Sequence, residues 1–203
     1  MNNLELSQGE KQRIVSYFRD CLLHHGYASA QSLDWVDALS QHRRFQVLEK
    51  IGDLNGKTIL DVGSGLGDFY KYLRKRGYNL KFTGIDLVPE FVAFSQSFHK
   101  GATFFVAELP EVTGQFDFVF ASGSLSFNIS NHRPYLLNSI KKMLELSKAG
   151  VGFNLLDSRR FTSDQDCAAY HPEEILSLAA PLAKKAALIQ GYLPQDFTIF
   201  LYK

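Results

Sequence analysis

Residues 59–68 read ILDVGSGLGD, a short apolar run that ends in an aspartate and three closely spaced glycines. An apolar, β-branched run followed by glycine predicts a buried strand and a tight turn, because glycine adopts backbone conformations that other residues avoid. The turn leads into residues 68–76, which predict a helix whose first N–H groups are free to bind a ligand. The stretch therefore predicts a strand, a ligand-binding loop and a helix in succession.

Strand and helix signals alternate on both sides of this unit. Strands are predicted over 57–63, 80–86, 102–108, 116–122 and 150–156, and prolines at 89, 134 and 172 favour helix starts. Residues 186–192 and 196–202 predict two further strands joined by a turn too short for a parallel crossover. The predicted fold is α/β, with a Rossmann-like, seven-stranded, mostly parallel sheet that ends in a C-terminal antiparallel hairpin.

The first 56 residues predict helices instead of strands. One amphipathic helix ends at Gly26, and Asp34 is predicted to cap the start of a second. We expect residues 1–56 to form an N-terminal helical lid on a core of residues 57–203, within one domain overall. The apolar positions that support these two helices are Ile14, Val15, Phe18, Cys21 and Leu22, then Val36, Leu39, Val47, Leu48 and Ile51.

Charge and cysteine content exclude several kinds of partner. The chain of 203 residues has 22 Lys plus Arg and 21 Asp plus Glu, a formal net charge of +1, which argues against nucleic acid or an anionic membrane as partner. Cys21 and Cys167 show no metal-ligand spacing, so no metal site is predicted. The start of the chain does not resemble a signal peptide, and no apolar run is long enough to span a membrane. We expect a cytoplasmic protein.

An acidic residue after the second predicted strand indicates what the glycine loop binds. Asp86 ends that strand, where a carboxylate can accept hydrogen bonds from both ribose hydroxyls of an adenosine. Alone, such a residue is commonly only a helix cap. Dinucleotide binding requires G-x-G-x-x-G, whereas here the third glycine comes one position early and Asp68 would repel a pyrophosphate. An adenosine ligand without a pyrophosphate is favoured.

These segments resemble the class I S-adenosylmethionine-dependent methyltransferases. ILDVGSGLG (59–67) and GIDLVPEFV (84–92) are similar to the first two motifs of that superfamily, and other segments resemble a subgroup of small bacterial methyltransferases of undefined substrate. The resemblance covers residues 57–203. It implies S-adenosyl-L-methionine as cofactor and methyl transfer by in-line displacement, in which the protein mainly aligns the reactants.

The resemblance also implies a set of cofactor-binding residues. Asp61 would hold the ammonium group, Asp86 the ribose, and Glu108 the adenine amino group. The full set that it implies is Asp61, Gly63, Ser64, Gly65, Gly67, Asp86, Leu87, Glu108, Leu109 and Ser122. Arg44 is added because Gln41 and Arg44 share a helix face and could reach the cofactor carboxylate, although Arg44 could equally be a surface residue.

The acceptor is predicted from what the chain lacks. No basic stripe occurs, and the fourth strand is not followed by the Asn/Asp-Pro-Pro-aromatic run typical of amide methyltransferases. We expect a small-molecule acceptor under the N-terminal helices, with His132 as candidate general base or as a helix-start residue. Two alternatives stay open, an NAD-dependent oxidoreductase and a non-catalytic S-adenosylmethionine-binding protein, and so does the oligomeric state.

Overall fold

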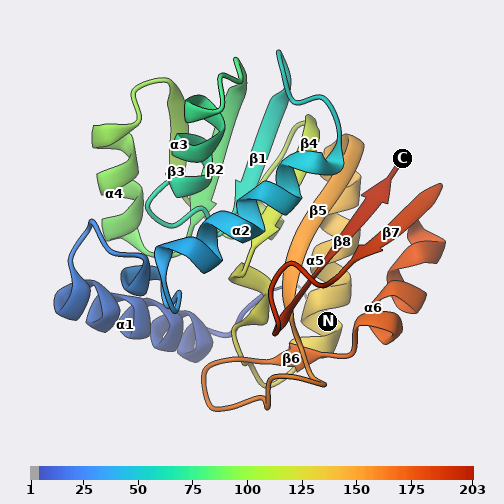
Figure 1. Ribbon diagram of the computed structural model, residues 1–203. Coiled ribbons are helices and arrows are strands. Elements are labelled where there is room, and N and C mark those ends of the chain that lie inside the picture. The colour runs from blue at the N-terminus through green and yellow to red at the C-terminus, as the bar shows by residue number, and fades with distance from the viewer. Residues whose placement is uncertain (1–4) are drawn as a thin grey trace.

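The computed structural model describes residues 5–203 and contains one continuous sheet (Figure 1). The strand order is β3-β2-β1-β4-β5-β8-β7, and the short strand β6 pairs with β5. Strands β1 to β5 run parallel, whereas β8 is antiparallel to both β5 and β7. This arrangement confirms the predicted sheet and its terminal hairpin, and adds β6. The strands are β1 Thr58–Val62, β2 Lys81–Asp86, β3 Ala102–Val106, β4 Phe116–Ser122, β5 Ser147–Asp157, β6 Ala169–Tyr170, β7 Lys185–Ile189 and β8 Asp196–Tyr202.

Helices connect the strands and begin close to the prolines. Pro89 and Pro172 occupy the first helical positions, where a missing N–H costs nothing, whereas the helix near Pro134 begins two residues earlier. The α-helices are α1 Gln8–His25, α2 Ala38–Leu48, α3 Asp68–Lys75, α4 Pro89–Phe98, α5 His132–Leu146 and α6 Pro172–Ala179. Short 3-10 turns are η1 Ala30–Leu33, η2 Glu49–Ile51, η3 Leu109–Glu111, η4 Ser124–Ser126 and η5 Ala180–Leu182.

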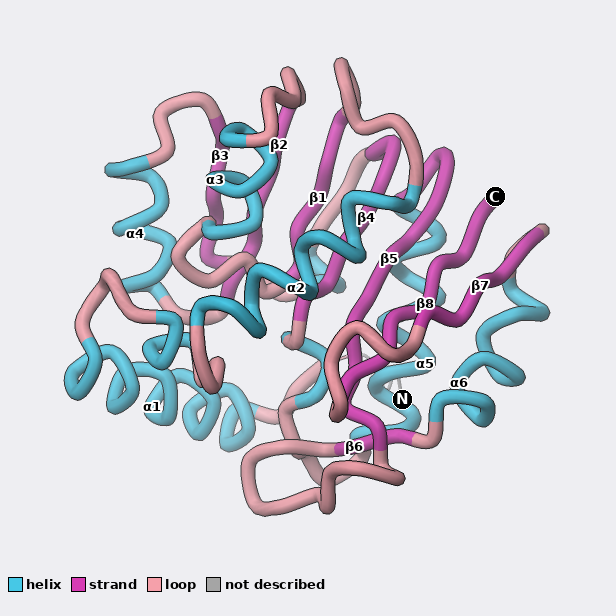
Figure 2. The backbone as a smooth tube through the Cα atoms, in the orientation of Figure 1, coloured by secondary structure: helices cyan, strands magenta, loops and turns pink. Residues whose placement is uncertain are grey.

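Each face of the sheet carries its own apolar core. Helices α5 and α6 cover one face, where Ile140 and Ile175 pack against Val151 and Phe197. Helices α2 and α3 cover the other face, and Figure 2 shows α2 crossing in front of the strands. Because both faces are buried, the central strands are apolar at successive positions, as in the run that begins the glycine motif.

The prediction for the second helix was wrong at its start. Asp34 closes η1 in the left-handed conformation, and it is Asp37 whose side chain accepts the Ser40 N–H and caps α2. Val36 and Leu39 lie outside the packed face and are 81% and 63% exposed. A 3-10 turn thus interrupts the chain between the two helices, and the apolar face of α2 begins only at Phe45.

The N-terminal elements cover the edge of the sheet where the parallel strands end. We call residues 8–34, which run from α1 through η1 to its closing residue Asp34, the N-terminal cover. In Figure 1, α1 runs along the lower edge of the sheet. Lys11 pairs with Glu108 after β3, Arg13 with Asp166 after β5, and Arg19 with Glu90 in α4. The cover is therefore tied to three separate segments and encloses a space beside the glycine loop.

Candidate functional site

The glycine loop brings three parts of the molecule close to the end of β1. Gly63, Gly65 and Gly67 all have positive φ, at 72°, 51° and 75°. An added Cβ would lie 2.2 Å from Ser124 Cβ at Gly63 and 2.7 Å from Leu33 Cδ2 at Gly65. At Gly67 it would lie 2.5 Å from the His99 ring, and Gly67 does not line the cavity. The first two glycines therefore shape the cavity wall, whereas Gly67 lets α4 pack against the loop.

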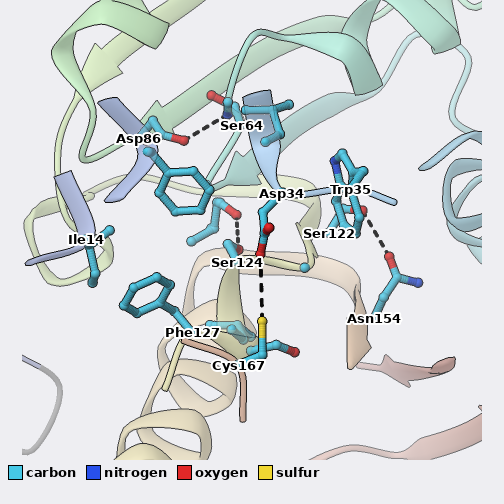
Figure 3. Close-up of a pocket in the computed structure, with 18 of the residues that line it drawn as sticks. Ile14, Asp34, Trp35, Ser64, Asp86, Ser122, Ser124, Phe127, Asn154 and Cys167 are labelled. Atoms are coloured by element: carbon cyan, nitrogen blue, oxygen red, sulfur yellow. Dashed lines mark hydrogen bonds between the residues drawn. The ribbon is translucent and has the colours of Figure 1, made fainter. Parts of the chain in front are cut away.

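A cavity of about 430 Å³ lies between this loop and the N-terminal cover. Its walls come from the ends of β1, β2, β4 and β5, from the cover, and from the loop between β5 and β6, as Figure 3 shows in part. The implied site residues that line it are Asp61, Gly63, Ser64, Gly65, Asp86, Leu87, Glu108, Leu109, Ser122 and Arg44. The fold thus brings all of the implied cofactor-binding residues except Gly67 to one cavity.

Asp61 is the most unusual of these residues, because its carboxyl group is buried and no cation among the described residues pairs with it. The residue is 2% exposed, and Oδ1 has no hydrogen-bond partner among the described residues. Burial, and secondarily the nearby Asp86 carboxylate, raises the pKa of Asp61 to about 8. The neighbouring Ser64 hydroxyl is also buried and without a partner in the described chain. A cationic group placed here would satisfy both side chains.

Asp86 is held in place by the loop that it faces. Its Oδ2 accepts the Gly65 N–H at 2.8 Å and its Oδ1 accepts the Val88 N–H at 2.9 Å. Burial raises the pKa of Asp86 although these two bonds act in the opposite direction. The carboxylate is therefore oriented toward the cavity beside Leu87, with lone pairs remaining for hydroxyl donors.

The far end of the cavity is defined by residues after β3 and β4. Glu108 lines the cavity and forms the ion pair with Lys11, and Leu109 beside it is buried. The Ser122 hydroxyl donates to Asn154 Oδ1 at 3.0 Å, so its side chain is anchored to β5. Glu108, Leu109 and Ser122 thus all line the cavity. The ion pair between Lys11 and Glu108 was not expected from the sequence.

Arg44 has a different environment from the one expected. Its Nε and Nη2 donate to the Asp196 carboxylate at 2.7–2.9 Å, and its guanidinium carbon lies 4.4 Å from the centre of the Trp35 ring. Gln41 donates to Asp68, so the two side chains expected to act together have separate partners. Only Nη1 of Arg44 is buried without a partner among the described residues, which leaves one N–H edge for a ligand.

His132 lies away from the cavity. It is the first residue of α5, its ring packs edge-on against Tyr170 at 5.6 Å, and it is not among the residues that line the cavity. Of the described residues that do line the cavity, none is histidine. The structure thus gives the candidate general base no contact with the site.

Several lining residues were missed by the sequence analysis. Tyr17 and Asp34 come from the N-terminal cover, and Phe161, Asp166 and Cys167 come from the irregular loop after β5. These residues carry no periodic or motif signal, because a loop that crosses a cavity is placed by long-range contacts. In residues 5–203 no cluster of His, Cys, Asp and Glu suited to a metal ion is found, and no helix has the length and apolarity to cross a membrane.

Comparison with known proteins relates this site to a family. A sequence model of a methyltransferase domain matches residues 59–146. A protein of Mycobacterium tuberculosis named as a methyltransferase is 28% identical over 156 residues, which cover 72% of this chain and 93% of that protein. The demethylmenaquinone methyltransferase of Thermotoga maritima is 26% identical over 124 residues, which cover 59% of this chain and 53% of that protein.

Solved structures support the same relationship at the level of the fold. Magnesium protoporphyrin IX methyltransferase from Synechocystis PCC 6803, solved with bound S-adenosylmethionine, superimposes with a TM-score of 0.72 at 15% identity. The superposition covers 98% of this chain and 99% of that one. The domain model that matches residues 59–146, which include the glycine motif after β1, and the shared fold make this chain similar to S-adenosylmethionine-dependent methyltransferases.

Proposed function

We propose that the protein transfers a methyl group from S-adenosyl-L-methionine to a small-molecule acceptor inside the cavity. The observation that carries the proposal is the buried Asp61 carboxylate, whose Oδ1 has no partner among the described residues. An uncompensated carboxylate is costly to bury, and a cationic ligand removes that cost. The ammonium group of the cofactor is such a ligand, whereas the pyrophosphate of NAD is not.

The other cofactor contacts follow from what each side chain can donate or accept. Asp86 accepts from the ribose hydroxyls, Leu87 flanks the adenine, and the Leu109 backbone N–H contacts the adenine ring. Glu108 accepts from the adenine amino group, and the free N–H edge of Arg44 donates to the cofactor carboxylate. The remaining contacts in this proposal come from Gly63, Ser64, Gly65 and Ser122 at the ends of β1 and β4.

The chemistry needs little from the protein beyond alignment. When bound, the cofactor supplies an electrophilic methyl group on a sulfonium. The chain's own residues orient the acceptor, and the N-terminal cover excludes water from the cavity. We propose this lid function for residues 1–56 and assign no proton transfer to His132, whose catalytic role stays a prediction.

The apolar walls of the cavity support a small-molecule acceptor. Trp35, Phe18 and Phe127 give the space beside the glycine loop apolar walls that suit a small molecule.

Cys21 and Cys167 are both free thiols, which fits a reducing compartment and the expected cytoplasmic location.

Binding calorimetry tests the cofactor assignment. We expect S-adenosylmethionine and S-adenosylhomocysteine to bind and NAD not to bind. Asp86→Asn removes a charge-assisted contact and should weaken both cofactors roughly 10- to 100-fold. Asp117→Asn, which alters a carboxylate bonded to Thr58 far from the cavity, is the matched control and should leave affinity unchanged.

The outcomes separate the candidate functions. Binding of NAD without binding of S-adenosylmethionine would contradict the assignment and favour an oxidoreductase. Cofactor binding without release of S-adenosylhomocysteine, over a panel of hydroxyl, amine, carboxylate and thiol acceptors, would favour the non-catalytic alternative.

A further inference from the structure

A second group of polar side chains faces the cavity on the side away from the glycine loop. Asp34 of the N-terminal cover lies opposite Cys167 of the loop after β5, with 3.8 Å between Cys167 Sγ and Asp34 Oδ2 (Figure 3). Tyr17 lies on the same side of the cavity and influences the Asp34 carboxylate. All three residues line the cavity, so the cover and the loop meet across it at Asp34.

The Asp34 carboxylate has no cationic partner. Within residues 5–203 no Lys, Arg or His nitrogen lies within ion-pair distance of it, whereas Arg13 is paired with Asp166 and Arg44 with Asp196. Partial burial, together with the negative charges of Asp166 and Asp164, raises the pKa of Asp34. This part of the cavity therefore has an uncompensated negative potential, which attracts a cation and repels an anion.

An unsatisfied hydroxyl lies on the wall that carries Cys167, opposite Asp34. Ser126 is 6% exposed, lines the cavity, and its Oγ has no partner among the described residues. Its carbonyl accepts the Ala168 N–H at 2.7 Å, which places it next to Cys167 in the structure. A buried hydroxyl without a partner is costly, and a ligand that can donate to it removes the cost.

Aromatic rings enclose this space. The rings of Tyr17 and Phe127 meet edge-on with centroids 5.6 Å apart, and Trp35 follows Asp34 in the chain and lines the cavity. Phe127 already carries the Arg13 guanidinium 4.5 Å from its centre, and Trp35 carries that of Arg44 at 4.4 Å, so rings in these surroundings stabilise positive charge that has left water. The ligand that these surroundings suit has an N–H donor, a positive charge and little further polarity.

We propose that the acceptor is a small amine whose nitrogen binds the Asp34 carboxylate and the Ser126 hydroxyl. This inference rests on the proposed methyltransferase function and assigns its acceptor class. An alcohol has no positive charge to pair with the Asp34 carboxylate, and a carboxylate ligand is repelled by it. Asp34 is a binding residue in this assignment, and Ser126 orients the same nitrogen.

The reaction gives the carboxylate a role beyond binding. The ammonium bound at Asp34 first loses a proton to water. The neutral nitrogen then uses its lone pair to form the new N–C bond, and the C–S bond breaks with its electron pair going to sulfur. The positive charge moves from sulfur to nitrogen, and the methylated ammonium then loses a proton to Asp34 or to water. A carboxylate beside the nitrogen stabilises the charge that develops in the transition state.

Calorimetry on the protein loaded with S-adenosylhomocysteine tests the inference. The probes are matched sets of an amine, its isosteric alcohol and its isosteric carboxylate, built on phenylethyl, indolylethyl and short alkyl groups. We expect an amine to bind at least tenfold more tightly than its partners. Asp34→Asn, which keeps the shape and tolerates the left-handed backbone, should abolish that preference. Asp20→Asn removes a charge from the outside of α1 and is the control.

Every outcome decides the matter. Amine preference lost in Asp34→Asn and kept in Asp20→Asn supports the inference. Preference for the alcohol or the carboxylate, no binding by any member of the sets, or an amine affinity within twofold of wild type in Asp34→Asn overturns it. Weaker S-adenosylmethionine binding in Asp34→Asn, with S-adenosylhomocysteine unchanged, would place Asp34 against the sulfonium and also overturn it. Failure of both cofactors to bind wild-type protein would instead refute the proposed function.

Discussion

Replacing Asp61 with asparagine should make the ligand-free protein more stable while it weakens cofactor binding. The carboxylate is buried and lacks a partner at Oδ1, and burial raises its pKa to about 8 from an ordinary value of 3.8. The folded state therefore holds a proton that the unfolded chain releases. Asparagine keeps the shape of the side chain and removes the titration.

The sign and size of the effect follow from proton linkage. A carboxyl group with a raised pKa binds protons more readily in the folded state, so the free energy of unfolding falls as pH rises from about 4 to 8. With the two pKa values of 3.8 and about 8, the wild type should lose about 3–4 kcal/mol more than Asp61→Asn between pH 5 and pH 8.

Urea unfolding of both proteins at pH 5, 6.5 and 8 measures this difference. The variant should gain most over wild type at pH 8 and least at pH 5. Asp86 contributes to the pH dependence in the same direction, and because the two carboxylates interact, the difference between the proteins includes their coupling. Calorimetry at pH 8 should show the more stable variant binding S-adenosylmethionine more weakly.

Asp117→Asn is the control for the change from carboxylate to amide. Hydrogen bonds from Thr58 lower the pKa of Asp117, so it is ionised in both folded and unfolded chains from pH 5 to pH 8. This variant should lose stability by the same amount at each pH. An Asp61→Asn variant that follows the wild-type pH dependence, or that is the less stable protein at pH 8, would refute the argument for a buried, uncompensated carboxylate.

Three further substitutions test the cavity walls and the cover. Gly63→Ala places a methyl group 2.2 Å from the Ser124 Cβ at a φ of 72°, whereas Gly77→Ala at a φ of 90° meets open space. Thermal unfolding should show that Gly77→Ala lowers the free energy of unfolding by about 1–2 kcal/mol and that Gly63→Ala lowers it clearly more. Asp196→Ala leaves Arg44 buried and unpaired, so urea unfolding should show a free energy of unfolding lower by about 3–5 kcal/mol. The double variant Arg44→Met with Asp196→Leu should largely restore the wild-type stability. Lys11→Met breaks a partly exposed ion pair and should change stability by less than about 1 kcal/mol. It should nevertheless speed cofactor dissociation in stopped-flow measurements, and an unchanged rate would show that this tie does not hold the cover closed.

The sheet could be predicted from the sequence because its signals are local. Each strand is a short apolar run next to glycine or proline, and the short turn between β7 and β8 permits only an antiparallel hairpin. The residues that the resemblance implies could be assigned to one edge of the sheet for the same reason, since Asp61, Gly63 and Asp86 lie within one strand–loop–helix–strand unit.

The errors and omissions arise where the chain is organised by distant contacts. A cap at Asp34 is as good a local pattern as one at Asp37, and only the packing of η1 against α1 decides between them. The partner of Arg44 lies 152 positions away, so spacing along α2 could not reveal that Asp196 would take two of its nitrogens. The contact between Asp34 and Cys167 spans 133 positions and is equally hidden.

The ion pair between Arg44 and Asp196 links the site to the order in which the chain is made. Helix α2 leaves the ribosome long before β8, so during synthesis its guanidinium has no carboxylate to meet. Because burying that charge without its partner is unfavourable, we expect α2 to dock only when β8 joins the sheet. The wall that Arg44 and Trp35 give to the cavity would then be completed late, and we expect a nascent chain that lacks β8 to have no finished cavity.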